Sequence, residues 1–259
     1  MALRLPALKM RQREALDGYL FILPWIAGFL AFVAGPMLIS FYISFTYTTG
    51  VSTPRWIGID NYVRMIAGDP LFWISLGNTL YYVVLSVPLT MVFGIFVAML
   101  LNQKVPGMAF FRTAYYLPSV VPAIASAVLW LQIFNTRWGL LNIVLGWVGL
   151  PRIPWLASTI WVKPALVIMS LWGFGAAMVI YLAGLQGIPQ ELYEAAQIDG
   201  AGAISRIRHI TLPLLSPVIF FNLIVGVIGA MQVFMSAYIM TNGGPLEASR
   251  FLVLHIFHY

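Results

Sequence analysis

Five long apolar blocks without a charged residue restrict this chain to one class of fold. Each block has at least 20 residues and contains no Asp, Glu, Lys or Arg. A helix needs about 20 mostly apolar residues to cross about 30 Å of hydrocarbon. We therefore predict an all-α polytopic membrane protein with five complete transmembrane helices. The blocks are Tyr19–Thr46, Trp73–Leu101, Tyr115–Phe134, Pro164–Gln186 and Leu212–Met240.

The composition supports a membrane protein and excludes several kinds of site. Of the 259 residues, 61% are hydrophobic and 8% are charged, whereas soluble domains carry about 25% charged residues. The absence of Cys excludes disulfides and Cys-ligated metals. The net charge of +6 does not indicate nucleic-acid binding, because the basic residues lie at helix ends and in loops rather than in a patch.

The two ends of the apolar region set the expected domain boundaries. The first block is too long for the apolar part of a signal peptide. We therefore predict a cytoplasmic N-terminal segment over residues 1–18 and a transmembrane domain over residues 19–259. Four basic residues precede the first block and place the N-terminus in the cytoplasm by the positive-inside rule. They are Arg4, Lys9, Arg11 and Arg13.

A truncated sixth helix is expected at the end of the sequence. It begins near Phe251 and stops at Tyr259, before it could cross a membrane. We therefore expect the sequence to be a fragment of a longer chain. The only candidates for a metal pair, His255 and His258, could share a helix face, but no carboxylate or Cys near them completes a site.

The spans lack the residues that drive transport or catalysis. The five blocks hold no Asp, Glu, Lys, Arg or His, although proton-coupled transporters keep such groups at membrane depth. No P-loop and no serine-hydrolase elbow is present. We therefore predict a non-catalytic membrane protein, and uphill transport would need energy from another chain. An intramembrane enzyme, a scaffold or a passive channel is the alternative class.

Two further patterns concern the spans and the loops between them. Prolines recur in the predicted helices, which indicates either bent helices that line a path or the ordinary abundance of Pro in membranes. The segment 135–162 is too broken by Gly and Pro to cross. We expect it to lie at the interface, anchored by Trp138, Trp147 and Trp155. Residues 241–250 predict a tight turn.

The loop 187–212 is charged although its neighbours are apolar. Pro189 and Glu191 suit the first turn of a helix, and Gly200 suits its end. We predict a short surface helix over Pro189–Asp199 and a second helical piece over Ala203–Ile210. Alone, such a helix is too short to be stable. It is either a helix that docks into a partner or an ordinary solvated loop.

The same loop resembles the EAA signature of the membrane subunits of binding-protein-dependent ABC importers. The signature is E-A-A, three residues, G, nine residues and I-x-L-P. The chain matches it at Glu194, Ala195, Ala196, Gly200, Ile210, Leu212 and Pro213. The segments 115–142 and "TNGGP" at 241–245 are similar to the carbohydrate-uptake, maltose-type branch of this family.

The resemblance implies a type I importer permease whose cytoplasmic loop is a coupling helix seated in an ATPase. Glu191 and Glu194 would contact the ATPase, and Ala195 and Ala196 would fill its cleft. ATP and Mg would bind to the ATPase, so this chain would hold no cofactor. The implied partners are a second homologous permease, two cytoplasmic ATPase subunits and an extracytoplasmic substrate-binding protein, all at a bacterial cytoplasmic (inner) membrane surrounded by lipid.

The substrate expected from the resemblance is a sugar, and the alternatives are glycerol phosphate, a polyol or an amino acid. The absence of cationic groups in the spans favours a neutral solute. Aromatic faces and amide groups suit such a ligand. The polar and aromatic candidates for the pathway are Trp172, Asn222, Gln232 and Tyr238, and packing is the alternative role for each.

Overall fold

The protein is described by a computed structural model that covers residues 10–48, 53–103 and 105–258. Two compact units make up the chain, Met1–Asp69 and Pro70–Tyr259. Of the predicted basic N-terminal cluster, Arg4 and Lys9 lie outside the described residues.

The first unit consists of one long helical stretch and a short capping region. The stretch runs over Met10–Ile43, so it begins before the predicted Tyr19, because charged residues such as Arg11 and Glu14 are good helix formers. The elements are α1 (Met10–Phe29), the π-helical η1 (Leu30–Ala34), α2 (Gly35–Ile43), β1 (Thr46–Tyr47), β2 (Arg55–Trp56), α3 (Asp60–Val63) and the π-helical η2 (Arg64–Gly68).

The capping region is held by a small polar and aromatic cluster. The strands β1 and β2 pair antiparallel, with Thr46 opposite Trp56. The side-chain amide of Asn61 donates to the carbonyls of Ser44 and Thr46, both at 2.9 Å. The rings of Phe45 and Trp56 stack with centroids 5.5 Å apart. These contacts satisfy backbone groups where the chain leaves the helix.

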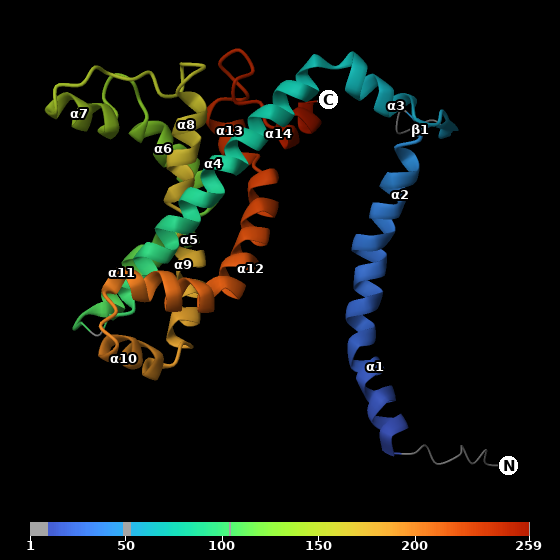
Figure 1. The fold of residues 1–259 in the computed structure, drawn as a ribbon. Helices are drawn as coiled ribbons and strands as arrows, with labels where there is room; N and C mark the ends of the chain where they lie inside the picture. Colours follow the sequence, from blue (N-terminus) through green and yellow to red (C-terminus); the bar gives the residue numbers. More distant parts are fainter. Residues whose placement is uncertain (1–9, 49–52, 104, 259) are drawn as a thin grey trace. The chain divides into compact units, whose positions relative to one another are not determined.

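The described residues of the second unit form helices joined by loops, without a strand, and α4 is the scaffold of the unit (Figure 1). This helix packs against α8, α9, α12 and α14. The elements are α4 (Pro70–Leu101), α5 (Met108–Val120), α6 (Ala123–Ile133), α7 (Leu140–Trp147), α8 (Val162–Leu171), α9 (Gly175–Gln186), α10 (Gln190–Ile198), α11 (Ala203–Arg206), the π-helical η3 (Ile207–Thr211), α12 (Leu212–Met231), α13 (Met235–Met240) and α14 (Leu252–His258).

Fewer continuous spans exist than the sequence predicts. Three described helical stretches are long and apolar enough to cross a membrane: Met10–Ile43, Pro70–Leu101 and Ala203–Met240. The number rises to five if each of two bent helix pairs counts as one span. The class is therefore an all-α membrane protein with three to five candidate spans.

The span expected over Tyr115–Phe134 is not one straight helix. The chain instead forms α5 and α6, which meet at 98°. Val121 and Pro122 have extended backbones with ψ of 129° and 139°. A residue before proline is pushed out of the α region, and the proline itself has no N–H to continue the ladder. Pro122 thus converts a predicted span into a sharp break.

The helix expected over Pro164–Gln186 is also interrupted, but more gently. The helices α8 and α9 are bent by 45° at Trp172–Phe174. Across the bend the N–H groups of Trp172, Gly173 and Phe174 each bond the carbonyl three residues earlier, at 3.1–3.4 Å. These tighter 3₁₀-type bonds keep the backbone paired while the axis changes direction.

The last long span is extended at one end and broken at the other. The piece expected over Ala203–Ile210 is not separate, because α11 continues through η3 into α12 (Figure 1). The block expected over Leu212–Met240 is interrupted between α12 and α13. The helix continues from η3 into α12 because the π-helical turn accommodates Pro213 near the start of α12.

The segment 135–162 contains one short helix, α7, and a buried asparagine that organises it. Asn142 is buried, and its Oδ1 accepts from the N–H of Ile153 at 3.0 Å and the indole of Trp155 at 3.2 Å. Trp138 and Trp147 are exposed, as an interfacial anchor requires. Trp155 is not an anchor, since its bond to Asn142 places it in the core.

Small residues allow the helices of the second unit to cross closely. Gly175 lies at the start of α9 against α5, where an added Cβ would stand 2.5 Å from the carbonyl oxygen of Tyr115 and 2.9 Å from the Cα of Tyr116. Both atoms belong to the backbone, so neither can rotate away. The crossing of α5 and α9 therefore depends on a residue without a side chain.

We expect Gly175→Ala to destabilise the second unit by about 2 kcal/mol, the usual cost of overpacking. The measurement is the midpoint of thermal unfolding in detergent. Gly77→Ala is the matched control, since its Cβ would meet nothing within 4 Å and alanine is the better helix former. Equal midpoints for the two variants would show that the crossing is not tightly packed.

Candidate functional site

Two cavities lie inside the second unit, between its two buried core clusters. The break cavity has a volume of about 270 Å³ and is bounded by both helix breaks. The bundle cavity has a volume of about 240 Å³ and lies between α4, α9 and α12. Tyr82 of one core cluster lines both cavities, and Tyr181 of the other cluster lines the bundle cavity.

Tyr82 and Ser170 line both cavities and form the partition between them. The remaining lining of the break cavity is Pro118, Ser119, Val121, Ser126, Leu166, Met169, Trp172, Gly173, Ala176 and Ser236. The remaining lining of the bundle cavity is Ser86, Val87, Thr90, Met91, Ala177, Tyr181, Asn222, Gly226, Gly229, Ala230 and Val233. Among these residues there is no charged side chain.

The polar groups of the cavities are uncharged hydroxyl and amide groups. The hydroxyls of Ser170 and Ser119 each donate to a carbonyl of their own helix at 2.6 Å. The amide of Asn222 donates to Val218 at 2.9 Å, which leaves its Oδ1 and a second N–H for a ligand. The buried hydroxyl of Tyr181 has no hydrogen-bond partner within the described residues. The lining therefore offers groups that can both donate and accept hydrogen bonds, which suits a neutral ligand with several hydroxyl groups.

Of the four pathway residues predicted from the sequence, two line a cavity in the structure, and each lines a different one. Trp172 lines the break cavity and meets Trp130 edge-to-face, with centroids 6.0 Å apart. Asn222 lines the bundle cavity. Gln232 and Tyr238 line neither cavity, and Tyr238 stacks on Phe234 instead.

The partition residues and the other hydroxyl groups were missed by sequence reasoning. The available signal was spacing, because Tyr82, Ser86 and Thr90 recur every four residues and so share one face of α4. Ser170 carried no such signal. Its position depends on the bend between α8 and α9, which brings the end of α8 against α4.

The charged loop folds as a short helix with well-defined ends. Pro189 is the N-cap of α10 rather than its first helical residue. At the other end Gly200 adopts φ +78°. Its N–H bonds the carbonyl of Gln197 at 3.1 Å, and the N–H of Ala201 bonds that of Ala196 at 2.8 Å. This is the Schellman motif, which favours Gly because the left-handed conformation is costly for other residues.

One face of α10 is tied to the unit and the other is exposed. The hydroxyls of Tyr193 and Thr211 lie 3.0 Å apart, which joins α10 to η3. Glu191, Glu194 and Ala195 are exposed, and Ala196 is half-buried. Two apolar side chains, Leu192 and Ile198, also face outward. Tyr193 was missed as a functional residue, since nothing in its spacing indicates the tie to Thr211.

The remaining signature residues lie where η3 passes into α12. Ile210 is half-buried, whereas Leu212 and Pro213 are exposed. Thr211 between them is buried, and its hydroxyl also lies 3.4 Å from the carbonyl of Arg206. The arrangement makes α10 an exposed surface with a single polar link to the base of α12.

Comparison with known proteins identifies the family. Residues 90–257 match the family described as the binding-protein-dependent transport system inner membrane component. The chain therefore belongs to the permease subunits of binding-protein-dependent ABC transporters. As such it is a multi-pass, non-catalytic membrane component without a cofactor of its own, and ATP is bound by the partner ATPase.

The relatives are similar over nearly the whole chain. The probable ABC transporter permease protein YesP of Bacillus subtilis (strain 168) is 42% identical over 95% of this chain and 81% of YesP. The trehalose/maltose transport system permease protein MalF of Thermococcus litoralis is 38% identical over 97% of this chain and 85% of MalF.

A solved structure has the same fold. It is the crystal structure of a bacterial alginate ABC transporter in complex with an alginate pentasaccharide-bound periplasmic protein. Its TM-score is 0.79 and its sequence identity 25%, with 95% of this chain and 83% of that chain covered. Family and fold together make this chain part of an ABC transporter complex.

We expect Tyr193→Phe to loosen α10, because it removes only the hydroxyl that meets Thr211. A typical net hydrogen bond contributes about 1 kcal/mol, so amide hydrogen exchange across Gln190–Ile198 should quicken by roughly fivefold. Tyr238→Phe is the control, because its exposed hydroxyl joins no other helix in the described contacts. Unchanged protection of α10 in Tyr193→Phe would contradict the tie.

Proposed function

We propose that this chain is a permease subunit of an ATP-driven sugar importer and forms half of its translocation pathway. The observation that carries the proposal is the pair of uncharged cavities lined with hydroxyl and amide groups beside two helix breaks. Discontinuous helices commonly form the substrate site of a transporter. The name of the Thermococcus relative agrees, since it concerns trehalose and maltose, and the structural neighbour imports another carbohydrate, the acidic polysaccharide alginate.

The size of the cavities limits how the substrate can be held. Ligand pockets usually measure about 300–1,000 Å³, and each cavity here is slightly smaller. A sugar would therefore occupy both cavities across the partition, or share one cavity with the partner permease. Trp172 would offer its aromatic face, and Asn222 an amide acceptor, with Gln232 and Tyr238 farther along the pathway.

The proposed topology has five spans and a cytoplasmic N-terminus. Each bent helix pair counts as one span, so the chain returns to the cytoplasm after α9 and places α10 there. The residues 1–18 would be cytoplasmic, and residues 19–259 the transmembrane domain of a type I importer permease in a bacterial cytoplasmic membrane. In the second unit α10 lies at the end opposite the 241–250 loop (Figure 1).

The exposed face of α10 is the proposed contact with the ATPase. Glu194 and Glu191 would pair with its basic groups, while the small Ala195 and Ala196 allow close approach. Closure of the ATPase would move α10, and the Tyr193–Thr211 link would pass that motion to α12 and the bundle cavity. The remaining partners in the proposal are a second homologous permease, a second ATPase subunit and an extracytoplasmic binding protein.

A polyol importer is the second candidate function. The same uncharged lining of hydroxyl and amide groups fits a polyol as well as a sugar. Glycerol phosphate and amino acids fit less well, because an anionic group would favour a cation in the lining and the described lining has none.

We expect Glu194→Lys to reduce ATP-driven uptake by roughly tenfold or more, since a charge-assisted contact contributes about 2 kcal/mol. The measurement is uptake by the complete transporter in proteoliposomes, together with recovery of the ATPase on purification. Glu14→Lys, the same substitution on the exposed surface of α1, is the matched control. Normal assembly and uptake by Glu194→Lys would exclude the ATPase contact.

We expect the binding protein that serves this permease to recognise a neutral sugar. A panel of mono- and disaccharides, polyols, amino acids and glycerol phosphate would be tested for a rise in its melting temperature, because a ligand that binds the native state stabilises it. The same compounds would then be tested for uptake. Stabilisation by amino acids or ions alone would contradict the sugar proposal.

A further inference from the structure

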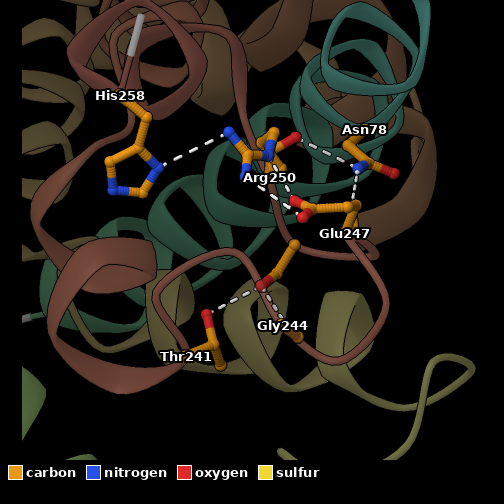
Figure 2. Close-up of polar contacts among 7 residues, drawn as sticks. Asn78, Thr241, Gly244, Glu247, Arg250 and His258 are labelled. Carbon is orange, nitrogen blue, oxygen red and sulfur yellow. Dashed lines mark hydrogen bonds and ion pairs between the residues drawn. The ribbon is translucent and has the colours of Figure 1, made fainter. Parts of the chain in front are cut away.

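The loop Thr241–Arg250 is closed on itself by side-chain bonds. The hydroxyl of Ser249 donates to the carbonyl of Gly244 at 2.6 Å and lies 2.7 Å from the hydroxyl of Thr241 (Figure 2). Arg250 and Glu247 form an ion pair, in which Nη2 of Arg250 also donates to Oε1 at 3.1 Å. This hydrogen bonding keeps the pKa of Glu247 below its ordinary range, so the pair stays charged at neutral pH.

The loop is held in a conformation that its sequence does not favour. Asn242, Leu246 and Glu247 have φ of 48°, 46° and 61°. For residues with a side chain such values cost roughly 1–3 kcal/mol each, and they persist only where the surroundings fix them. Leu246 nevertheless points outward and is 91% exposed. The loop therefore behaves as a fixed body rather than as a flexible connection.

Asn78 on α4 ties this body to two helices. Its Nδ2 donates to the carbonyls of Glu247 at 2.9 Å and Arg250 at 3.1 Å (Figure 2). Its Oδ1 accepts from Nζ of Lys163, on α8, at 3.1 Å. Asn78 is buried and thus uses both halves of its amide. We call these contacts the Asn78 junction.

The junction continues along α4 and α8 to the partition between the cavities. The N–H of Leu252 donates to the hydroxyl of Thr79 at 2.9 Å, and the rings of Phe251 and Tyr82 lie 5.3 Å apart. Tyr82 is four residues after Asn78, and Ser170 is seven after Lys163. Both spacings place the residues on the same face of their helix.

We propose that Asn78 is a positioning residue that couples the 241–250 loop to the Tyr82–Ser170 partition during transport. The inference rests on the proposed function, in which the cavities are the pathway and α10 is cytoplasmic, so that this loop, at the opposite end of the second unit (Figure 1), is on the side of the binding protein. A movement imposed on the loop is transmitted through Asn78 to α4 and through Lys163 to α8. The two helices, and with them the two halves of the partition, then move together.

The test compares Asn78→Ala with Asn142→Ala in the assembled transporter. Both asparagines are buried and hold backbone groups of loop segments, with exposures of 5% and 3%, but the hydrogen-bond partners of Asn142 among the described residues all lie within the segment 135–162. The readout is ATP hydrolysis stimulated by the binding protein, loaded with a sugar that raises its melting temperature. Maximal rate and half-saturating binding-protein concentration are measured separately.

We expect Asn78→Ala to lower the maximal stimulated rate by roughly tenfold or more, as a small misplacement far from the chemistry can. The half-saturating concentration should change by no more than about twofold, which is well under 1.4 kcal/mol, because the loop keeps its own internal bonds. Asn142→Ala should change neither value. A maximal rate near that of the unmodified protein, or an equal loss in Asn142→Ala, would overturn the proposal.

Two further variants separate the arms of the junction. Asn78→Asp keeps an acceptor for Lys163 but loses the two hydrogen bonds donated to the loop. Lys163→Met loses the bond between α8 and Asn78 but keeps the bonds from Asn78 to the loop. We expect a reduced maximal rate in each, with the aspartate variant also serving if the alanine variant fails to assemble. If the binding protein stimulates ATP hydrolysis by the Asn78→Asp transporter to the rate of the unmodified transporter, the proposed coupling is wrong. Failure of the unmodified transporter to take up any sugar would instead overturn the proposed function.

Discussion

Every backbone N–H and C=O group inside a membrane must find a partner, because hydrocarbon offers none. This requirement keeps α4 unbroken over its 32 residues and makes each helix break costly. The breaks at Val121–Pro122 and Trp172–Phe174 occur together, and both border the break cavity. Hydroxyl side chains gather in the same place. The two breaks therefore bring several hydroxyl side chains to one cavity.

The cavities and the two ends of the second unit are connected through few polar contacts. At one end the Tyr193–Thr211 pair joins α10 to the base of α12, which lines the bundle cavity. At the other end Asn78 joins the 241–250 loop to α4 and α8. The remaining contacts between these helices are mostly apolar. Such packing resists compression but does not fix the direction in which a helix moves. Directional hydrogen bonds at the two ends can therefore set which helices move as one body when either end is displaced.

The sequence predicted the class of fold and the position of the charged loop well, because both depend on local patterns. Apolar length alone indicated a helix over Trp73–Leu101, which the structure has as Pro70–Leu101, and Gly200 indicated the end of α10. The breaks were not predictable in the same way. Pro24, Pro88 and Pro217 lie within continuous helices, so a proline by itself does not reveal a break. Only the tertiary surroundings decide whether the freed backbone groups are satisfied. The role of Trp155 was wrong for a similar reason, since its partner Asn142 lies 13 residues away.

The signature loop and the cavities carry different kinds of information about function. The loop matches a signature of the family, and under the proposed function it is the contact with the ATPase. A signature shared across the family does not indicate which solute is carried. The partition residues Tyr82 and Ser170 lie outside that pattern, as do the hydroxyl groups on α4 that share their face. Under the proposed function such residues would contribute to substrate choice, because an uncharged lining discriminates against a ligand that carries charge. The uncharged lining is thus a stronger argument for a neutral sugar or polyol than the signature through which the family is recognised.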